Sequence, residues 1–162
     1  MVERALVPAG DRIQKFTGLF DFTLDKKGRL VIPARIRNVL DVFGVTNLTL
    51  RFLDLDDYSC IRAYPTGYYN QNILGKLSEF EEGETADDTF EILLLTANAH
   101  DVKIDSQWRL NIPDDLLKKL EIDKEARIVG MGNFFDIWRS DVFEDFTKTR
   151  MAARKKRAEK DG

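Results

Sequence analysis

The same hydrophobic and polar pattern occurs twice in the chain. Residues 24–33 read LDKKGRLVIP and residues 104–113 read IDSQWRLNIP, so that an aliphatic residue, Asp, Arg, Leu, Ile and Pro recur in register. A segment that recurs at a fixed spacing is typical of a protein built from repeated units. We therefore expect one structural unit to be used twice.

In each copy the pattern of residues predicts a strand, a tight corner, a short strand and a helix that begins at proline. Apolar residues alternate with polar ones before the first corner, as in a half-buried strand over residues 19–25. After each proline, apolar residues fall four apart and give each short helix one apolar stripe: Ile32, Ile36 and Leu40, then Ile112, Leu116 and Leu120. Neither unit of about 40 residues could bury enough surface alone. We therefore expect the copies to pack about a pseudo-twofold axis.

The segments between and after the two copies also have clear periods. Residues 48–52 and 59–64 predict a hairpin with a polar turn at 54–57. A helical stripe covers residues 66–80, an acidic linker follows at 81–88, and residues 89–99 favour a helix, although 92–95 also fit a strand. The second unit predicts strands around residue 102 and at 110–112, a helix at 113–120, and a hairpin of 126–129 with 134–138. A last helix from Ser140 is expected to bury Val142, Phe143 and Phe146.

Composition limits the possible classes of protein. The 162 residues, 43% hydrophobic and 33% charged, are ordinary for a globular protein. The single cysteine, Cys60, excludes an internal disulfide framework, and the single histidine, His100, leaves no convincing zinc site. We interpret Cys60 as a small core residue, with a reactive thiol as the alternative, and His100 as structural. Without an apolar run of membrane length or a signal peptide, we expect a cytoplasmic protein that lacks a cofactor.

Charge is distributed unequally between the two copies. The net charge is −3, but residues 25–37 carry five basic side chains against one acidic side chain. The matching residues 105–117 carry Arg109 against Asp105, Asp114 and Asp115. Only the first copy therefore offers a concentrated cationic surface, which is the electrostatic requirement for binding nucleic acid.

The cationic residues of the first copy are candidate DNA-binding residues. Lys26 and Lys27 would place mobile charges at the tip of the corner, and Arg29 could offer a planar fork to a phosphate or a guanine edge. Arg35 and Arg37 of the following helix complete this set of five residues: Lys26, Lys27, Arg29, Arg35 and Arg37. A second set of residues is interpreted as structural: Asp25, Gly28, Asp105 and Arg109. Gly28 permits a tight turn, and the spacing of each Asp with its Arg could fix the corner.

The two Asp-x-x-x-Arg motifs, each followed by a proline and a helix, resemble the MraZ family of bacterial transcriptional regulators. The resemblance covers roughly residues 16–146. It depends on FTG at 16–18, LDKKGR at 24–29, IPARIR at 32–37, YP at 64–65 and GNFFDIW at 132–138. It implies an α+β fold in which two pseudo-symmetric SpoVT-AbrB-like swapped-hairpin repeats form a small barrel with flanking helices. The implied divisions are repeat 1 at 19–63, connecting helices and the acidic linker at 64–98, repeat 2 at 99–142, and the helix end with a basic tail at 143–162.

The resemblance also implies a function. The family pattern is a sequence-specific DNA-binding regulator that usually represses, acting on short direct repeats upstream of the division and cell-wall gene cluster that includes its own gene. The implied partners are double-stranded promoter DNA and further copies of the chain in a homo-oligomeric ring, in the cytoplasm at the nucleoid. Trp108 replaces the glycine usual in the second corner, so we expect that corner to be buried or remodelled. Residues 1–15, interpreted as an arm, and the basic tail at 148–160 lie outside the secure match.

Two other classes of function compete with a DNA-binding regulator. An enzyme is not expected, because the sequence offers no nucleophile with a base, no phosphate-binding glycine loop and no metal cluster. An oligomeric structural or protein-interaction module without DNA binding is the alternative, because the chain is acidic overall. Loss of DNA retention with rising salt would distinguish the regulator from such a module.

Overall fold

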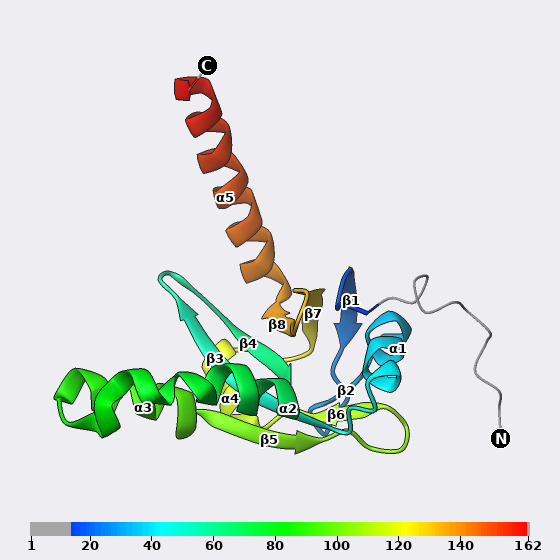
Figure 1. Ribbon diagram of the computed structural model, residues 1–162. Helices are drawn as coiled ribbons and strands as arrows, with labels where there is room; N and C mark the ends of the chain where they lie inside the picture. The colour runs from blue at the N-terminus through cyan, green and yellow to red at the C-terminus, as the bar shows by residue number, and fades with distance from the viewer. Residues whose placement is uncertain (1–13, 162) are drawn as a thin grey trace.

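The computed structural model describes residues 14–161, which form an α+β structure around a six-stranded antiparallel sheet (Figure 1). The strand order is β1-β7-β8-β4-β3-β5. The strands are β1 (Leu19–Thr23), β3 (Asn47–Leu55), β4 (Tyr58–Pro65), β5 (Ala99–Lys103), β7 (Glu125–Gly130) and β8 (Phe135–Arg139). A separate antiparallel ribbon pairs β2 (Arg29–Val31) with β6 (Arg109–Asn111). The expected N-terminal arm lies almost entirely outside the described residues.

The sheet is pseudo-symmetric. If each strand of the first half of the chain trades places with its counterpart in the second half, the strand order stays the same. The counterparts are β1 with β5, β2 with β6, β3 with β7, and β4 with β8, and the order then reads the same from the other end. As a result β1 pairs with β7, from Leu19 opposite Val129, while β5 pairs with β3. The first strand of each half therefore completes the hairpin of the other half.

The apolar stripes of the two short helices meet in one core. Helices α1 (Ala34–Val42) and α4 (Asp114–Leu120) begin directly after Pro33 and Pro113. All six stripe residues are buried, as the periodicity predicts: Ile32, Ile36, Leu40, Ile112, Leu116 and Leu120. They belong to a single cluster with residues of β3, β4, β7 and β8. The two halves therefore share one core, which buries more apolar surface than either half could bury alone.

The segment between the two halves is helical but irregular. It consists of α2 (Thr66–Tyr68), the π-helical η2 (Tyr69–Ile73) and the 3-10 helix η3 (Leu74–Gly83), followed by α3 (Ala86–Thr96). The helix predicted over residues 66–80 is therefore present without regular α-helical geometry, and a helix rather than a strand covers 92–95. The prediction of an acidic linker is wrong for residues 86–88. These lie in the first turn of α3, where the Thr85 side chain caps the Asp88 N–H at 3.0 Å and acidic groups suit the positive end of the helix.

The last helix is longer and less buried than expected. α5 (Ser140–Asp161) follows β8 directly and includes the predicted basic tail. Val142, Phe143 and Phe146 are only half-buried, so the expectation that they are buried is wrong. Phe143 and Phe146 pack against Trp138 of β8, but the rest of the helix projects away from the sheet and adds no further cover to these residues (Figure 1).

The expected small barrel is not found. Strands β1 and β5 stand at opposite ends of the strand order, and no pairing joins them within residues 14–161. The β2–β6 ribbon pairs separately, and its ends are linked by two equivalent hydrogen bonds, from the Ile32 N–H to the Trp108 carbonyl and from the Ile112 N–H to the Gly28 carbonyl. The six-stranded sheet therefore remains open.

Candidate nucleic-acid interface

The first corner is held by hydrogen bonds to one carboxylate. Oδ1 of Asp25 accepts the backbone N–H groups of Lys27 and Arg29, both at 2.9 Å. Oδ2 accepts the Nε–H of Arg29 at 2.8 Å. The Gly28 N–H also donates to the Asp25 carbonyl at 3.0 Å. The hydrogen bonds to the carboxylate from Arg29 and Lys27, chiefly the one from the Arg29 backbone, outweigh desolvation and lower the pKa of Asp25 below its ordinary value of 3.8.

The second corner repeats this arrangement. Oδ1 of Asp105 accepts the N–H groups of Gln107 at 2.8 Å and Arg109 at 2.9 Å, and Oδ2 accepts the Arg109 Nε–H at 2.7 Å. Desolvation opposes ionisation of Asp105, but the hydrogen bonds from Arg109 and Gln107 outweigh it and its pKa is lowered. The Arg29 and Arg109 side chains are 27% and 28% exposed. The two corners thus have one framework and the same ion pair.

Trp108 does not remodel the second corner. Its φ of 56° matches the positive φ of Gly28, 74°, at the equivalent position. Its side chain is half-buried against the core, while Ser106 and Gln107 at the tip are exposed. The expectation of a buried or remodelled corner is therefore wrong, because a tryptophan here accepts the left-handed conformation and packs inward.

The predicted cations lie on the first corner and on the helix that follows it. Lys26 and Lys27 are exposed at its tip. In the part of the chain that the structure describes, the side chain of Arg29 bonds to Asp25 through Nε, so its two terminal nitrogens remain available to a ligand. Arg35 and Arg37 are exposed on α1 but are two positions apart, so they project from different sides of that helix. Three of the five cations therefore lie within residues 26–29, and the other two lie on α1.

A buried ion pair was missed by the sequence reasoning. Arg62 on β4 donates to both oxygens of Asp136 on β8, at 2.8 and 3.1 Å, and its guanidinium lies 4.2 Å from the centre of the Phe134 ring. Asp136 is 1% exposed. The available signal was a charged residue within each of two apolar strands, CIRA at 60–63 and FFDI at 134–137. This pair joins the halves of the sheet at its centre.

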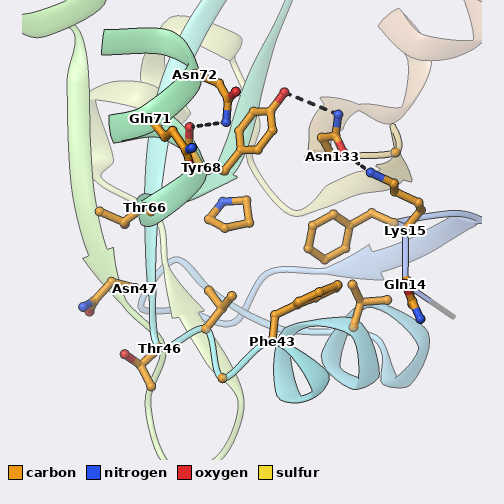
Figure 2. Close-up of a pocket in the computed structure, with 17 residues that line it drawn as sticks. Gln14, Lys15, Phe43, Thr46, Asn47, Thr66, Tyr68, Gln71, Asn72 and Asn133 are labelled. Carbon is orange, nitrogen blue, oxygen red and sulfur yellow. Dashed lines mark hydrogen bonds between the residues drawn. The ribbon is translucent and has the colours of Figure 1, made fainter. Parts of the chain in front are cut away.

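The structure also has a cavity of about 620 Å³ between α1, α2, β3 and the turn at 132–133 (Figure 2). Lys15 donates to the side-chain oxygen of Asn133, whose amide nitrogen donates to the hydroxyl of Tyr68 at 3.4 Å. None of the five predicted DNA-binding residues lines this cavity. The concave site and the cationic corner are thus separate.

Residues 14–161 contain no cluster of three or more side chains suited to hold a metal ion. Of the helices in that range, none combines the length and the apolar composition needed to cross a membrane.

Comparison with known proteins gives a consistent result. A family model described as "MraZ protein, putative antitoxin-like" matches residues 95–161. The transcriptional regulator MraZ of Cytophaga hutchinsonii is 33% identical over 132 residues, which are 81% of this chain and 83% of that protein. The proteins of the same name from Mycoplasma mobile (33% over 132 residues, 80% and 83% covered) and Oenococcus oeni (34% over 133 residues, 82% and 86%) are similar to the same extent. The chain therefore belongs to the MraZ family, whose members are transcriptional regulators and not enzymes.

Proposed function

We propose that this chain is a sequence-specific DNA-binding transcriptional regulator whose first corner, residues 25–29, contacts DNA. The observation that supports this assignment is the contrast between two corners with one hydrogen-bond framework. The first presents Lys26 and Lys27 at its tip, whereas the second presents Ser106 and Gln107. The two corners thus have the same geometry but different charges, as expected if the first binds an anionic partner and the second has a structural role.

The geometry suggests how each side chain would act. Asp25 orients the guanidinium of Arg29 through Nε, so that the terminal N–H groups could form a bidentate contact with a guanine edge or a phosphate. Lys26 and Lys27 would neutralise phosphates, which supplies affinity without sequence information. Arg35 and Arg37 would contact the backbone on either side. Asp25 would act by positioning Arg29.

One corner offers few contacts, so several copies must act together. We infer a homo-oligomeric ring that binds short direct repeats, because repeated subunits match repeated sites and linked contacts raise the overall affinity. We further infer repression of the division and cell-wall gene cluster that includes its own gene, in the cytoplasm at the nucleoid. These inferences follow the family resemblance, and the names of the relatives support regulation of transcription.

We also infer that residues 19–63 and 99–142 are SpoVT-AbrB-like repeats, linked by residues 64–98 and followed by the C-terminal segment 143–162. The exchange of β1 and β5 between the halves supports this division, since each proposed repeat supplies an outer strand to the other. The exchange is the feature expected of swapped hairpins.

A footprint on DNA upstream of the protein's own gene tests the proposal, with the variant Lys26→Ser/Lys27→Gln as comparison. This variant gives the first corner the tip of the second. We expect wild-type protein to protect short direct repeats, and the variant to reduce the slope of log affinity against log salt by about two per bound corner. A wild-type protein that protects no sequence, at any salt concentration, would favour the protein-interaction module.

A further inference from the structure

Two projecting segments of the chain carry large and opposite charges. Residues 79–91, here called the acidic hairpin, contain seven carboxylates and no basic residue: Glu79, Glu81, Glu82, Glu84, Asp87, Asp88 and Glu91. Residues 148–160, here called the basic helix end, contain seven basic residues and one acid: Lys148, Arg150, Arg154, Lys155, Lys156, Arg157 and Lys160, with Glu159. All seven basic side chains are exposed, and so are all the acidic ones except the half-buried Asp88.

Neither charged segment is neutralised within the described chain. The salt bridges of residues 14–161 involve other side chains, in the two corners, at Arg62, at His100, at Arg127 and at Arg139. Packing many like charges together raises the energy of a folded chain unless counterions or a partner offset them. Both segments therefore present a surface suited to a partner of opposite charge.

Each segment also exposes apolar side chains among its charges. On α3, Phe90 is 58% exposed and Leu93 is 49% exposed. Asp87 lies three residues before Phe90, so it shares that face of the helix. On α5, Met151 is 65% exposed. Lys148, Arg154 and Lys155 lie three or four positions from Met151 and surround it on one face. The two surfaces thus match in chemistry, with an apolar centre and a charged border of opposite sign.

The two segments of one copy lie apart in the structure. The base of α5 packs against β4, β7 and β8 and is tied to β4 by the Tyr58 hydroxyl, which bonds to Asp145 at 3.0 Å and to Thr149 at 3.2 Å. α3 packs against η3 and β5, at one edge of the sheet. In Figure 1 the basic helix end and α3 extend from the sheet in different directions. A complementary partner for either segment is therefore another molecule, and a second copy of this chain carries both surfaces.

We propose that the basic helix end of one copy docks on the acidic hairpin of a second copy, with Met151 against Phe90 and Leu93. Such a contact joins two different surfaces of the same chain, so each copy keeps one free surface of each kind and can bind a further copy. A contact of this type closes into a ring when the rotation allows it. The inference rests on the proposed homo-oligomer and names the surfaces that hold it together.

The experiment is a charge exchange in the full-length protein. Arg154→Glu/Lys155→Glu reverses two charges beside Met151, Asp87→Lys/Glu91→Lys reverses two on α3, and the fourfold variant restores attraction with opposite polarity. Lys103→Glu/Lys124→Glu is the matched control, because it makes the same charge change at exposed lysines outside both segments. Assembly is measured by sedimentation velocity over a range of concentrations, at low and high salt.

We expect each double variant of the two segments to raise the concentration of half-assembly by at least about tenfold, since close charge pairs across an interface are strongly coupled. The fourfold variant should return to within about threefold of wild type, the control should assemble like wild type, and high salt should weaken wild-type assembly. Unchanged assembly of either double variant, or a fourfold variant that does not recover, would overturn the proposal.

DNA retention separates this inference from the proposed function. If Arg154→Glu/Lys155→Glu loses DNA while its assembly is unchanged, the basic helix end contacts phosphates and the docking proposal is wrong. If charge exchange controls assembly but wild-type protein retains no DNA, the docking surface stands and the DNA-binding function fails.

Discussion

Gly28 and Trp108 occupy equivalent positions in two corners of the same shape, both with positive φ, at 74° and 56°. Glycine adopts this conformation without a steric penalty, whereas a tryptophan there is unusual. Trp108 is half-buried against the core, and this packing offsets the backbone cost. One corner is thus tight because it lacks a side chain, and the other because a large side chain lies inward.

Gly28→Ala is expected to destabilise the protein by about 1–2 kcal/mol. The positive φ is unfavourable for alanine, and its Cβ would lie 3.2 Å from Cδ1 of Leu117. Gly44→Ala is a suitable control, because Gly44 also has a positive φ, 63°, but no atom within 4 Å of the added Cβ. Urea unfolding should show the smaller loss for Gly44→Ala. Equal losses would mean that the Leu117 contact costs nothing.

Arg29→Ala and Arg109→Ala are expected to separate DNA binding from stability. Each arginine forms the same partly exposed ion pair, so each substitution should cost about 1 kcal/mol or less. Only Arg29→Ala should abolish specific DNA retention, with the oligomer unchanged, whereas Arg109→Ala should affect folding more than affinity. Thermal unfolding and retention on operator DNA give the two readings. Disassembly of Arg29→Ala would assign Arg29 a structural role.

Acid should weaken both corners, because the pKa values of Asp25 and Asp105 are lowered in the folded state. A carboxyl whose pKa is lower when folded stabilises the protein above its unfolded pKa, and this stabilisation is lost as pH falls through the folded pKa. The loss should therefore begin near pH 5 and continue below the ordinary value of 3.8. In Asp25→Asn/Asp105→Asn the dependence of unfolding free energy on pH over this range should be flatter. An unchanged slope would contradict the assignment.

Arg62→Ala should be the most destabilising of these substitutions, by about 3 kcal/mol, because it leaves the buried carboxylate of Asp136 without its partner. Arg62→Met/Asp136→Leu removes both charges and should cost less than the single change. Urea unfolding of the two variants makes the comparison. A double variant less stable than the single one would indicate that the pair contributes more than charge compensation.

Cys60 should be unreactive in the folded protein. The thiol is fully buried, and burial together with the nearby Asp136 raises its pKa well above the ordinary value. An alkylating reagent at pH 8 should modify Cys60 in urea but not under native conditions, as mass spectrometry can measure. Rapid native modification would favour the reactive thiol that the sequence left open.

The parts of the fold that depend on neighbours in sequence could be predicted. The stripe of Ile36 and Leu40 sets α1 through a local period, and the two hairpins follow from alternation beside turn residues. Pairings between distant segments could not be predicted, because a strand such as β1 does not encode its partner locally. Arg62 and Asp136 illustrate the same limit. Each appears as an anomaly in its own strand and becomes intelligible only when β4 lies beside β8.

The candidate site could also be predicted only in part. The cations of residues 25–37 and the contrast with residues 105–117 were visible in the sequence, as was the glycine at the first corner. The spacing of each Asp with its Arg indicated a fixed corner, but not that the two corners would have the same hydrogen bonds. Trp108 misled, because its bulk suggested a different turn although its backbone follows that of Gly28.

The pairing of β1 with β7 has a consequence for synthesis on the ribosome. Leu19 lies opposite Val129, 110 residues later in the chain, so β1 leaves the exit tunnel long before its neighbour is translated. At about 5–20 residues per second, the nascent chain keeps this strand without a partner for roughly 5–20 s. During that interval its open edge is a template for pairing with other polypeptides. Early protection by a chaperone, or a slow codon profile after the first half, would therefore affect the yield of this protein more than that of one whose strands pair in order.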